Sequence, residues 1–92
     1  MFEYIKYMPQ TNITKAKARA KSLGVEVRPS TQKYKKLDVF KDGKKVASIG
    51  DNRYSDYLQH GDEERRRRYK ARHEPHRHKK NTPSFYADQI LW

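Results

Sequence analysis

The 92-residue chain is long enough for one small domain and carries 22 Lys and Arg against 11 Asp and Glu, a formal net charge of +11. Leu, Ile, Val and Phe together number only 15, less than the share of about 20% below which highly charged chains tend to be disordered, so we expect a partner to add stability. The absence of cysteine excludes disulfides and thiolate zinc sites, and no apolar run is long enough for a membrane span or a signal peptide.

The first third of the chain predicts an edge strand followed by a basic helix. Residues 2–7 alternate loosely between apolar and polar side chains, as an edge strand does. From residue 11 the pattern becomes helical, with Asn12 or Thr14 as the N-cap and Gly24 as the stop. The apolar stripe of this helix consists of Ile13, Ala16, Ala20 and Leu23. Because the stripe is mostly alanine, the helix must pack either very closely or weakly.

The middle of the chain predicts a small antiparallel sheet. The segment VEVRPS is typical of a short strand that ends at Pro29. Asp42 and Gly43 then separate two β-rich runs, and this pair suits a type I′ turn, which needs positive φ at both central positions. A hairpin in this register places Val39 opposite Val46.

The last third predicts one basic helix or two short ones, followed by a linker and an apolar end. Asp62 is the expected N-cap, acidic residues fill the first turn and basic residues the last, and Pro75 marks the stop. Residues 76–84 are expected to be an extended linker. Residues 85–92 then form an apolar anchor, to which we add Tyr69. The anchor residues are Tyr69, Phe85, Tyr86, Leu91 and Trp92.

These elements predict a single small α+β domain over residues 1–92. Its antiparallel hairpin or sheet is flanked by an N-terminal basic helix and by a C-terminal basic helix with an apolar tail. Residues 1–29 form an N-terminal strand and helix extension, and residues 30–92 contain the hairpin, the basic helix and the anchor.

Four consecutive arginines at residues 65–68 are the most conspicuous charge run. Successive helical residues turn by about 100°, so at most two of the four can share a face. The others must meet solvent or nearby acids such as Asp62, Glu63 and Glu64. Three interpretations remain open for the run: a solvated or internally paired helix, a phosphate contact by one or two arginines, and contact with an acidic protein.

Most of the positive charge lies upstream of the arginine run. Residues 1–46 hold twelve Lys and Arg against four acids, whereas residues 47–92 hold ten against seven. Tyr34 and Phe40 lie among the upstream lysines and could offer stacking faces, although a solvated lysine surface is an equal alternative. The candidate residues for an anionic partner are Lys15, Lys17, Arg19, Lys21, Lys33, Lys35, Lys36, Lys44, Lys45, Arg66, Arg68 and Arg72.

Other site chemistries find weaker support. His73, His76 and His78 are close in sequence, but Pro75 interrupts them and only Glu74 could add a ligand, so we expect neither a metal nor another cofactor. A nuclease-like cluster would need Asp51, Asp56, His60 and Asp62, whose carboxylates more simply serve as turn residues and helix caps. We therefore expect no enzyme. The tyrosines, including Tyr54 and Tyr57, are expected mainly in the core.

The segments STQKYKKLDVFKDGKKVASIGDNRYSDYLQHGDEERRRRYKARH and TPSFYADQILW together resemble a family of small basic-domain proteins of large DNA viruses and some tailed phages. The resemblance covers residues 30–92. It is carried by residues 35–43, 46–50, 54–57 and 85–92, by His60, and by Arg66, Tyr69, Arg72 and His73. It implies no catalytic residues. It does imply a particle component or a protein that acts on viral DNA.

The leading functional hypothesis is a non-enzymatic virion structural protein, a minor capsid or cement-like subunit held by larger capsid or other virion proteins. The alternative is a viral or phage protein that binds nucleic acid without sequence preference, located in the host cytoplasm or nucleus with viral DNA. Neither hypothesis includes a membrane span.

Overall fold

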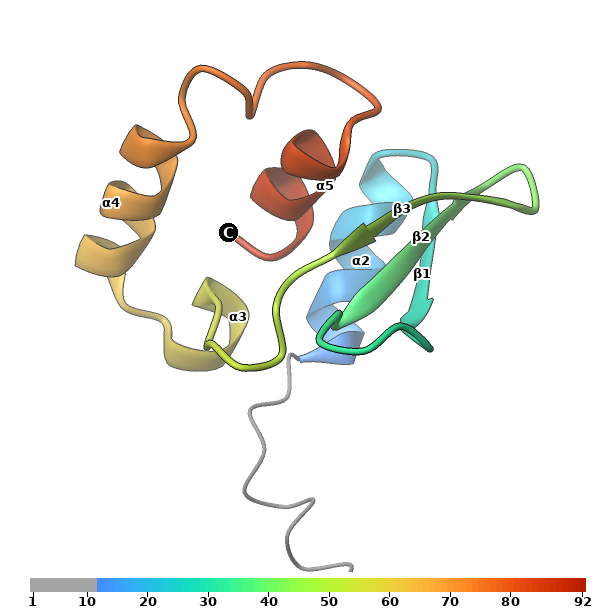
Figure 1. Ribbon diagram of the computed structural model, residues 1–92, viewed down its shortest axis with the longest axis horizontal. Helices are drawn as coiled ribbons and strands as arrows, with labels where there is room; N and C mark the ends of the chain where they lie inside the picture. Colours follow the sequence, from blue (N-terminus) through green and yellow to red (C-terminus); the bar gives the residue numbers. More distant parts are fainter. Residues whose placement is uncertain (1–11) are drawn as a thin grey trace, which may run out of the picture.

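The computed structural model describes residues 12–92, which form an α+β fold with a three-stranded antiparallel sheet (Figure 1). This architecture, with one helix before the sheet and others after it, confirms the predicted fold class. The edge strand expected at residues 2–7 lies outside the described residues. The elements are α2 (Ile13–Ser22), β1 (Glu26–Pro29), β2 (Leu37–Lys41), β3 (Lys44–Ile49), α3 (Tyr57–His60), α4 (Glu63–Arg72) and α5 (Pro83–Ile90).

Helix α2 begins and ends as its sequence predicts. The side chain of Asn12 accepts a hydrogen bond from the Lys15 backbone N–H at 3.1 Å, and Gly24 has a φ of +76° just beyond the helix. Ala16 and Ala20 are fully buried, and the helix packs against β1 and α5. The alanine stripe therefore indicates close packing of backbones, not a weak contact.

The β2–β3 hairpin has the predicted turn but not the predicted register. Asp42 and Gly43 have φ values of 53° and 80°, the two positive values that a type I′ turn needs. A bulge between Val39 and Phe40 then shifts the pairing, so that Val39 faces Ala47. The predicted pairing of Val39 with Val46 was wrong, because a turn sets the register only as far as the first bulge. The bulge places Ala47 in the core and leaves Val46 exposed.

Helix α5 completes the hydrophobic core on the face of the sheet that α2 also covers. Thr82 caps it by accepting from the Phe85 backbone N–H at 3.2 Å, and Pro83 occupies its first turn. The core residues are Ala16, Ala20, Val25, Val27, Leu37, Val39, Ala47, Ile49, Tyr86, Ile90 and Leu91.

The segment before α5 is not the extended linker that was predicted for residues 76–84. Residues 73–78 form successive turns, in which the backbone N–H groups of His76 and Arg77 both donate to the His73 carbonyl. Local hydrogen bonding thus compacts a charged segment that has no apolar periodicity of its own. Pro83, taken as part of the linker, belongs to α5.

The basic segment forms two helices, one of the two predicted arrangements. Asp56 caps α3 in a capping box with Gln59, and Gly61 ends that helix with a φ of +64°. Asp62 then caps α4 by accepting from two backbone N–H groups, as predicted. Helix α4 has no fully buried residue and lies at one edge of the molecule (Figure 1). Within residues 12–92, no helix has the length and apolar character that crossing a bilayer requires.

Candidate functional site

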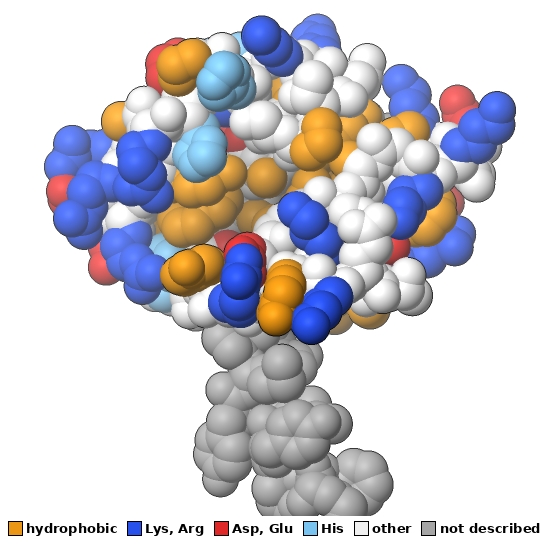
Figure 2. All heavy atoms as spheres, in the orientation of Figure 1, with side chains coloured by type: hydrophobic (Ala, Val, Ile, Leu, Met, Phe, Trp, Pro, Cys, Tyr) orange, Lys and Arg blue, Asp and Glu red, His pale blue; other side chains and the backbone are white. Residues whose placement is uncertain are grey.

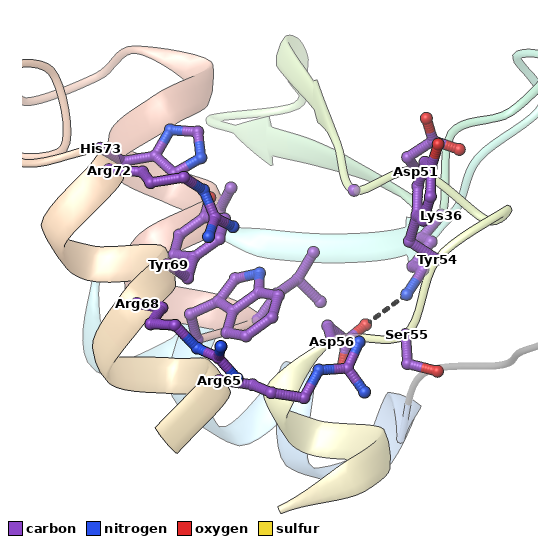
Figure 3. Close-up of a pocket in the computed structure, with 14 residues that line it drawn as sticks. Lys36, Asp51, Tyr54, Ser55, Asp56, Arg65, Arg68, Tyr69, Arg72 and His73 are labelled. Atoms are coloured by element: carbon purple, nitrogen blue, oxygen red, sulfur yellow. Dashed lines mark hydrogen bonds and ion pairs between the residues drawn. The ribbon is translucent and has the colours of Figure 1, made fainter. Parts of the chain in front are cut away.

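A cleft with a volume of ≈ 440 Å³ lies between α4 and the segment that follows β3. Figure 3 shows the side chains of α4 on one side and Lys36, Asp51 and Tyr54 on the other. The last residues of the chain contribute the remaining lining. The lining residues are Lys36, Gly50, Asp51, Tyr54, Ser55, Asp56, Arg65, Arg68, Tyr69, Arg72, His73, Ala87, Leu91 and Trp92.

The α4 wall carries three arginines in a row along the helix. Arg65, Arg68 and Arg72 are three and then four positions apart, a spacing that places side chains on one face of a helix. Within residues 12–92, neither Arg65 nor Arg72 has a carboxylate at ion-pair distance, and Arg68 forms a long ion pair with Glu64, at 3.9 Å, on the exposed surface of the helix. We call these three residues the arginine row. Because neighbouring acids neutralise little of its positive charge, the row presents that charge to the cleft.

The other two arginines of the run lie outside the cleft lining and are occupied. Arg66 Nε donates to the main-chain oxygen of Trp92 at 2.7 Å, and its guanidinium lies 5.1 Å from the centroid of the Tyr57 ring. Arg67 pairs with Glu64. The sequence predicts that at most two of the four consecutive arginines share a helix face. The structure agrees, since only Arg65 and Arg68 of the four line the cleft. Arg72, the third member of the arginine row, lies outside the four.

A column of aromatic rings attaches α4 to the rest of the fold. Tyr69 stacks on Trp92 with ring centroids 4.2 Å apart and planes 4° apart, and His73 covers the other face of Tyr69 at 4.1 Å. The ring centroid of His60 lies 5.4 Å from that of Trp92, with the two planes inclined by 58°. Burial raises the pKa of Tyr69 to about 12, so its hydroxyl stays protonated at neutral pH. Because Trp92 and His73 cover the two faces of the Tyr69 ring, neither face is available to a ligand.

The opposite wall is held by a buried ion pair. Lys36 Nζ lies 2.7 Å from Asp56 Oδ2, and the side chains are 4% and 3% exposed. Lys36 also donates to the Gln59 side-chain oxygen. Lys36 is one of the residues predicted to contact an anionic partner, but a carboxylate twenty residues along the chain already pairs with it in the interior.

Two further residues of this wall face solvent. Asp51 accepts hydrogen bonds from the Arg53 side chain and backbone, which hold the pKa of Asp51 at about 2. Tyr54 is 66% exposed, and no ring within residues 12–92 stacks on it. The prediction that tyrosines serve the core was therefore wrong for Tyr54, whereas Tyr86 is a core residue.

A second buried carboxylate ties α4 to α5. The Asp88 side chain is fully buried and accepts from Lys70 Nζ at 2.8 Å and from Arg77 at 3.3 Å. Neither cation was a candidate for partner binding, and both are committed to the fold. Together with the aromatic column, this network fixes the position of the arginine row.

Most upstream candidates lie exposed on other surfaces and do not line the cleft. Figure 2 shows Lys and Arg side chains along the α4 edge and again toward the hairpin end of the molecule. Arg19 is partly buried and donates weakly to the Ile90 carbonyl at 3.5 Å, and Lys45 lies 3.8 Å from Asp38. The exposed candidates without an ion pair inside residues 12–92 are Lys15, Lys17, Lys21, Lys33, Lys35 and Lys44.

The apolar anchor residues belong to the interior of this chain. Tyr86 and Leu91 are core residues, and Phe85 and Trp92 pack against the core. Tyr69, expected to face inward, does so through its stack on Trp92. The apolar anchor therefore packs against the core of its own chain.

The histidines and acids have local roles. His78 pairs with Glu74 at 2.9 Å, and His60 accepts from the Asp62 backbone N–H at 2.8 Å through Nδ1. Asp56 and Asp62 cap helices, as expected. No group of three potential metal ligands occurs in the described part of the chain.

Sequence reasoning missed Arg65 and Tyr54 as site residues. The spacing of Arg65 relative to Arg68 and Arg72 was a usable signal, because it predicts a shared helix face. Tyr54 carried no such signal, since only the fold determines whether a tyrosine in an irregular segment is exposed.

Comparison with known proteins identifies one family. A family model of unknown function, DUF5754, matches residues 25–73. This range includes both walls of the cleft but not Ala87, Leu91 and Trp92. No curated protein and no solved structure matches the chain. Because the model covers more than half of the sequence, the chain belongs to the DUF5754 family, a family of unknown function.

Proposed function

We propose that the protein binds nucleic acid without sequence preference and that the arginine row contacts the phosphates. The observation that carries the proposal is the alignment of Arg65, Arg68 and Arg72 on one wall of a concave site of ≈ 440 Å³. Arginine suits this role because its planar guanidinium stays charged and can donate two parallel hydrogen bonds to one phosphate.

The surroundings of the row favour nucleic acid over an acidic protein. Exposed Tyr54 lies across the cleft from the arginines, and cations combined with exposed aromatic rings are typical of surfaces that bind single strands. The net charge of +11 adds a long-range attraction to any phosphate polymer. An acidic protein would use the charge but would have no particular need for the ring.

The virion structural role and the viral origin remain predictions. Part of their support is the sequence-based expectation that the apolar end of the chain docks into another subunit. Because Tyr86 and Leu91 are buried in the core of this chain, that support no longer applies. A basic protein packed with nucleic acid inside a particle would satisfy both expectations.

Fluorescence anisotropy with labelled random-sequence oligonucleotides tests the proposal. We expect binding at about 50 mM salt and a steep loss of affinity as salt rises, through counterion release. Affinity should differ little between sequences of equal length, because phosphates carry no sequence information. If neither single strands nor duplexes bind at about 50 mM salt, the proposal is wrong.

A matched pair of triple variants locates the contact. Replacing Arg65, Arg68 and Arg72 by Gln should weaken binding at least about tenfold and lower the salt slope by about two to three. The control replaces Lys15, Lys17 and Lys21 on α2 by Gln. It removes the same charge from an exposed surface that does not line the cleft. Equal losses in the two variants would show that net charge, not the arginine row, drives binding.

A further inference from the structure

We infer that the cleft receives one unpaired nucleotide of a single strand, with its base against Tyr54 and the adjacent phosphates on the arginine row. This inference rests on the proposed function and names its substrate class. It predicts that single strands bind more tightly than duplexes of the same length.

The size and shape of the cleft favour an unpaired nucleotide. Its volume of ≈ 440 Å³ falls within the range of about 300–1,000 Å³ of sites that enclose small ligands. A duplex keeps its bases stacked inside, and a base can enter a concave site only after it has been extruded from the stack. An unpaired base in a single strand does not require the free energy of unpairing that extrusion from a duplex requires.

The arginine row has a length that suits a strand passing the cleft. Arg65 and Arg72 are seven residues apart, which corresponds to about 10 Å along a helix. This length lets the row reach phosphates on both sides of one bound nucleotide. Arg68 lies between them and can contact either phosphate.

Tyr54 is the ring of the cleft that is available to a base. Both faces of Tyr69 are covered, by Trp92 and by His73, and Trp92 itself contacts both Tyr69 and His60. Tyr54 is 66% exposed, and no ring of the described chain stacks on it. Every base has a π-face, so stacking on this tyrosine adds affinity without adding sequence preference.

Both walls are held in place before any ligand binds. The buried pair of Lys36 and Asp56 supports the segment that carries Tyr54, and the contacts of Arg66 and Lys70 hold α4. A preformed site loses little conformational entropy on binding, and this strengthens the attraction for a flexible single strand.

The test compares binding of an oligo-dT of about 12 nucleotides with binding of a duplex of the same length. Wild-type protein should prefer the single strand by about tenfold, and Tyr54→Ala should remove most of that preference by lowering the affinity for oligo-dT far more than the affinity for the duplex. Tyr54→Phe should retain the preference, because it keeps the ring. Tyr34→Ala is the matched control, since Tyr34 is also an exposed tyrosine but does not line the cleft.

Trp92 gives an independent readout of where the strand lies. It is the single tryptophan of the chain and lines the cleft. Titration with oligo-dT should therefore change the tryptophan fluorescence until the site is saturated. Titration with duplex should change the fluorescence much less.

The possible outcomes separate the two proposals. If neither ligand binds, the proposed function is wrong and the inference is lost with it. If single strand and duplex bind equally, or if Tyr54→Ala matches wild type on oligo-dT, the inference alone is overturned. A thermal melt of each variant should equal that of wild type, because the Tyr54 side chain is mostly exposed.

Discussion

Tyr69 stacks face to face on Trp92, with ring centroids 4.2 Å apart and planes inclined by only 4°. The two residues belong to α4 and to the end of the chain. Because α4 has no fully buried residue, this contact supplies much of the apolar attachment of the helix that carries the arginine row.

Trp92→Ala should destabilise the fold by about 2–3 kcal/mol, less than a fully buried tryptophan because the indole is partly exposed. Urea unfolding followed by circular dichroism measures the change. Trp92→Phe is the control and should lose about 1 kcal/mol, since it retains a ring that can stack on Tyr69. Equal stability of wild type and Trp92→Ala would contradict the role given to the stack.

Lys36→Met should lower the free energy of unfolding by about 3–5 kcal/mol, because it removes the ammonium that lies 2.7 Å from the buried Asp56 carboxylate. The neighbouring Lys35 is exposed and forms no ion pair inside residues 12–92, so Lys35→Met should change the free energy of unfolding by less than about 0.5 kcal/mol. Urea unfolding of the two variants in parallel makes the comparison. Similar small effects would mean that the buried pair contributes nothing to stability.

Gly50→Ala should destabilise the fold by about 2–4 kcal/mol. Gly50 has a φ of +78°, and an added Cβ would lie 2.9 Å from Leu91 Cδ1 and 3.0 Å from Lys36 Cβ, so backbone strain and overlap add together. Gly61 has a φ of +64° but open space around its Cβ position, so Gly61→Ala should cost only about 1 kcal/mol. Thermal or urea melts distinguish the pair. Equal costs would rule out the predicted overlap.

Mild acid should destabilise the fold through His60. Burial lowers the pKa of His60 below its ordinary value of 6.5, and Arg65 acts in the same direction against the opposing charges of Asp62 and Asp56. The unfolded chain therefore takes up the proton more readily, and the free energy of unfolding falls as pH drops below about 6.5. The stabilisation is present above that pH and is lost as the pH falls through the lower, folded-state pKa.

Unfolding curves between about pH 7 and about pH 5 test this dependence. His60→Gln should reduce the slope, with a remainder from His73, whose pKa burial also lowers. A slope unchanged in His60→Gln would place the acid sensitivity elsewhere in the molecule.

Local features of the fold could be predicted well. Asn12 and Asp62 cap their helices, and the Asp42–Gly43 turn has the expected positive φ values. Each of these features depends on hydrogen bonds or backbone preferences within a few residues, which a sequence pattern contains in full.

Features that depend on distant contacts were predicted poorly. A bulge pairs Val39 with Ala47 and places both in the core, and no pattern within the strands indicates it. The turns at residues 73–78 are held in part by Arg77, whose partner Asp88 lies eleven residues further on.

The sequence by itself determined the charge of the chain, its helix caps and its hairpin turn, because these follow from composition and from neighbouring residues. Only the tertiary structure decided which cations remain available to a partner. Lys36 and Lys70 are neutralised by carboxylates twenty and eighteen positions away, whereas Arg65 and Arg72 have no acid at ion-pair distance in the described chain. Ion pairing and burial depend on which distant segments meet, so the available charge could be found only once the chain was folded.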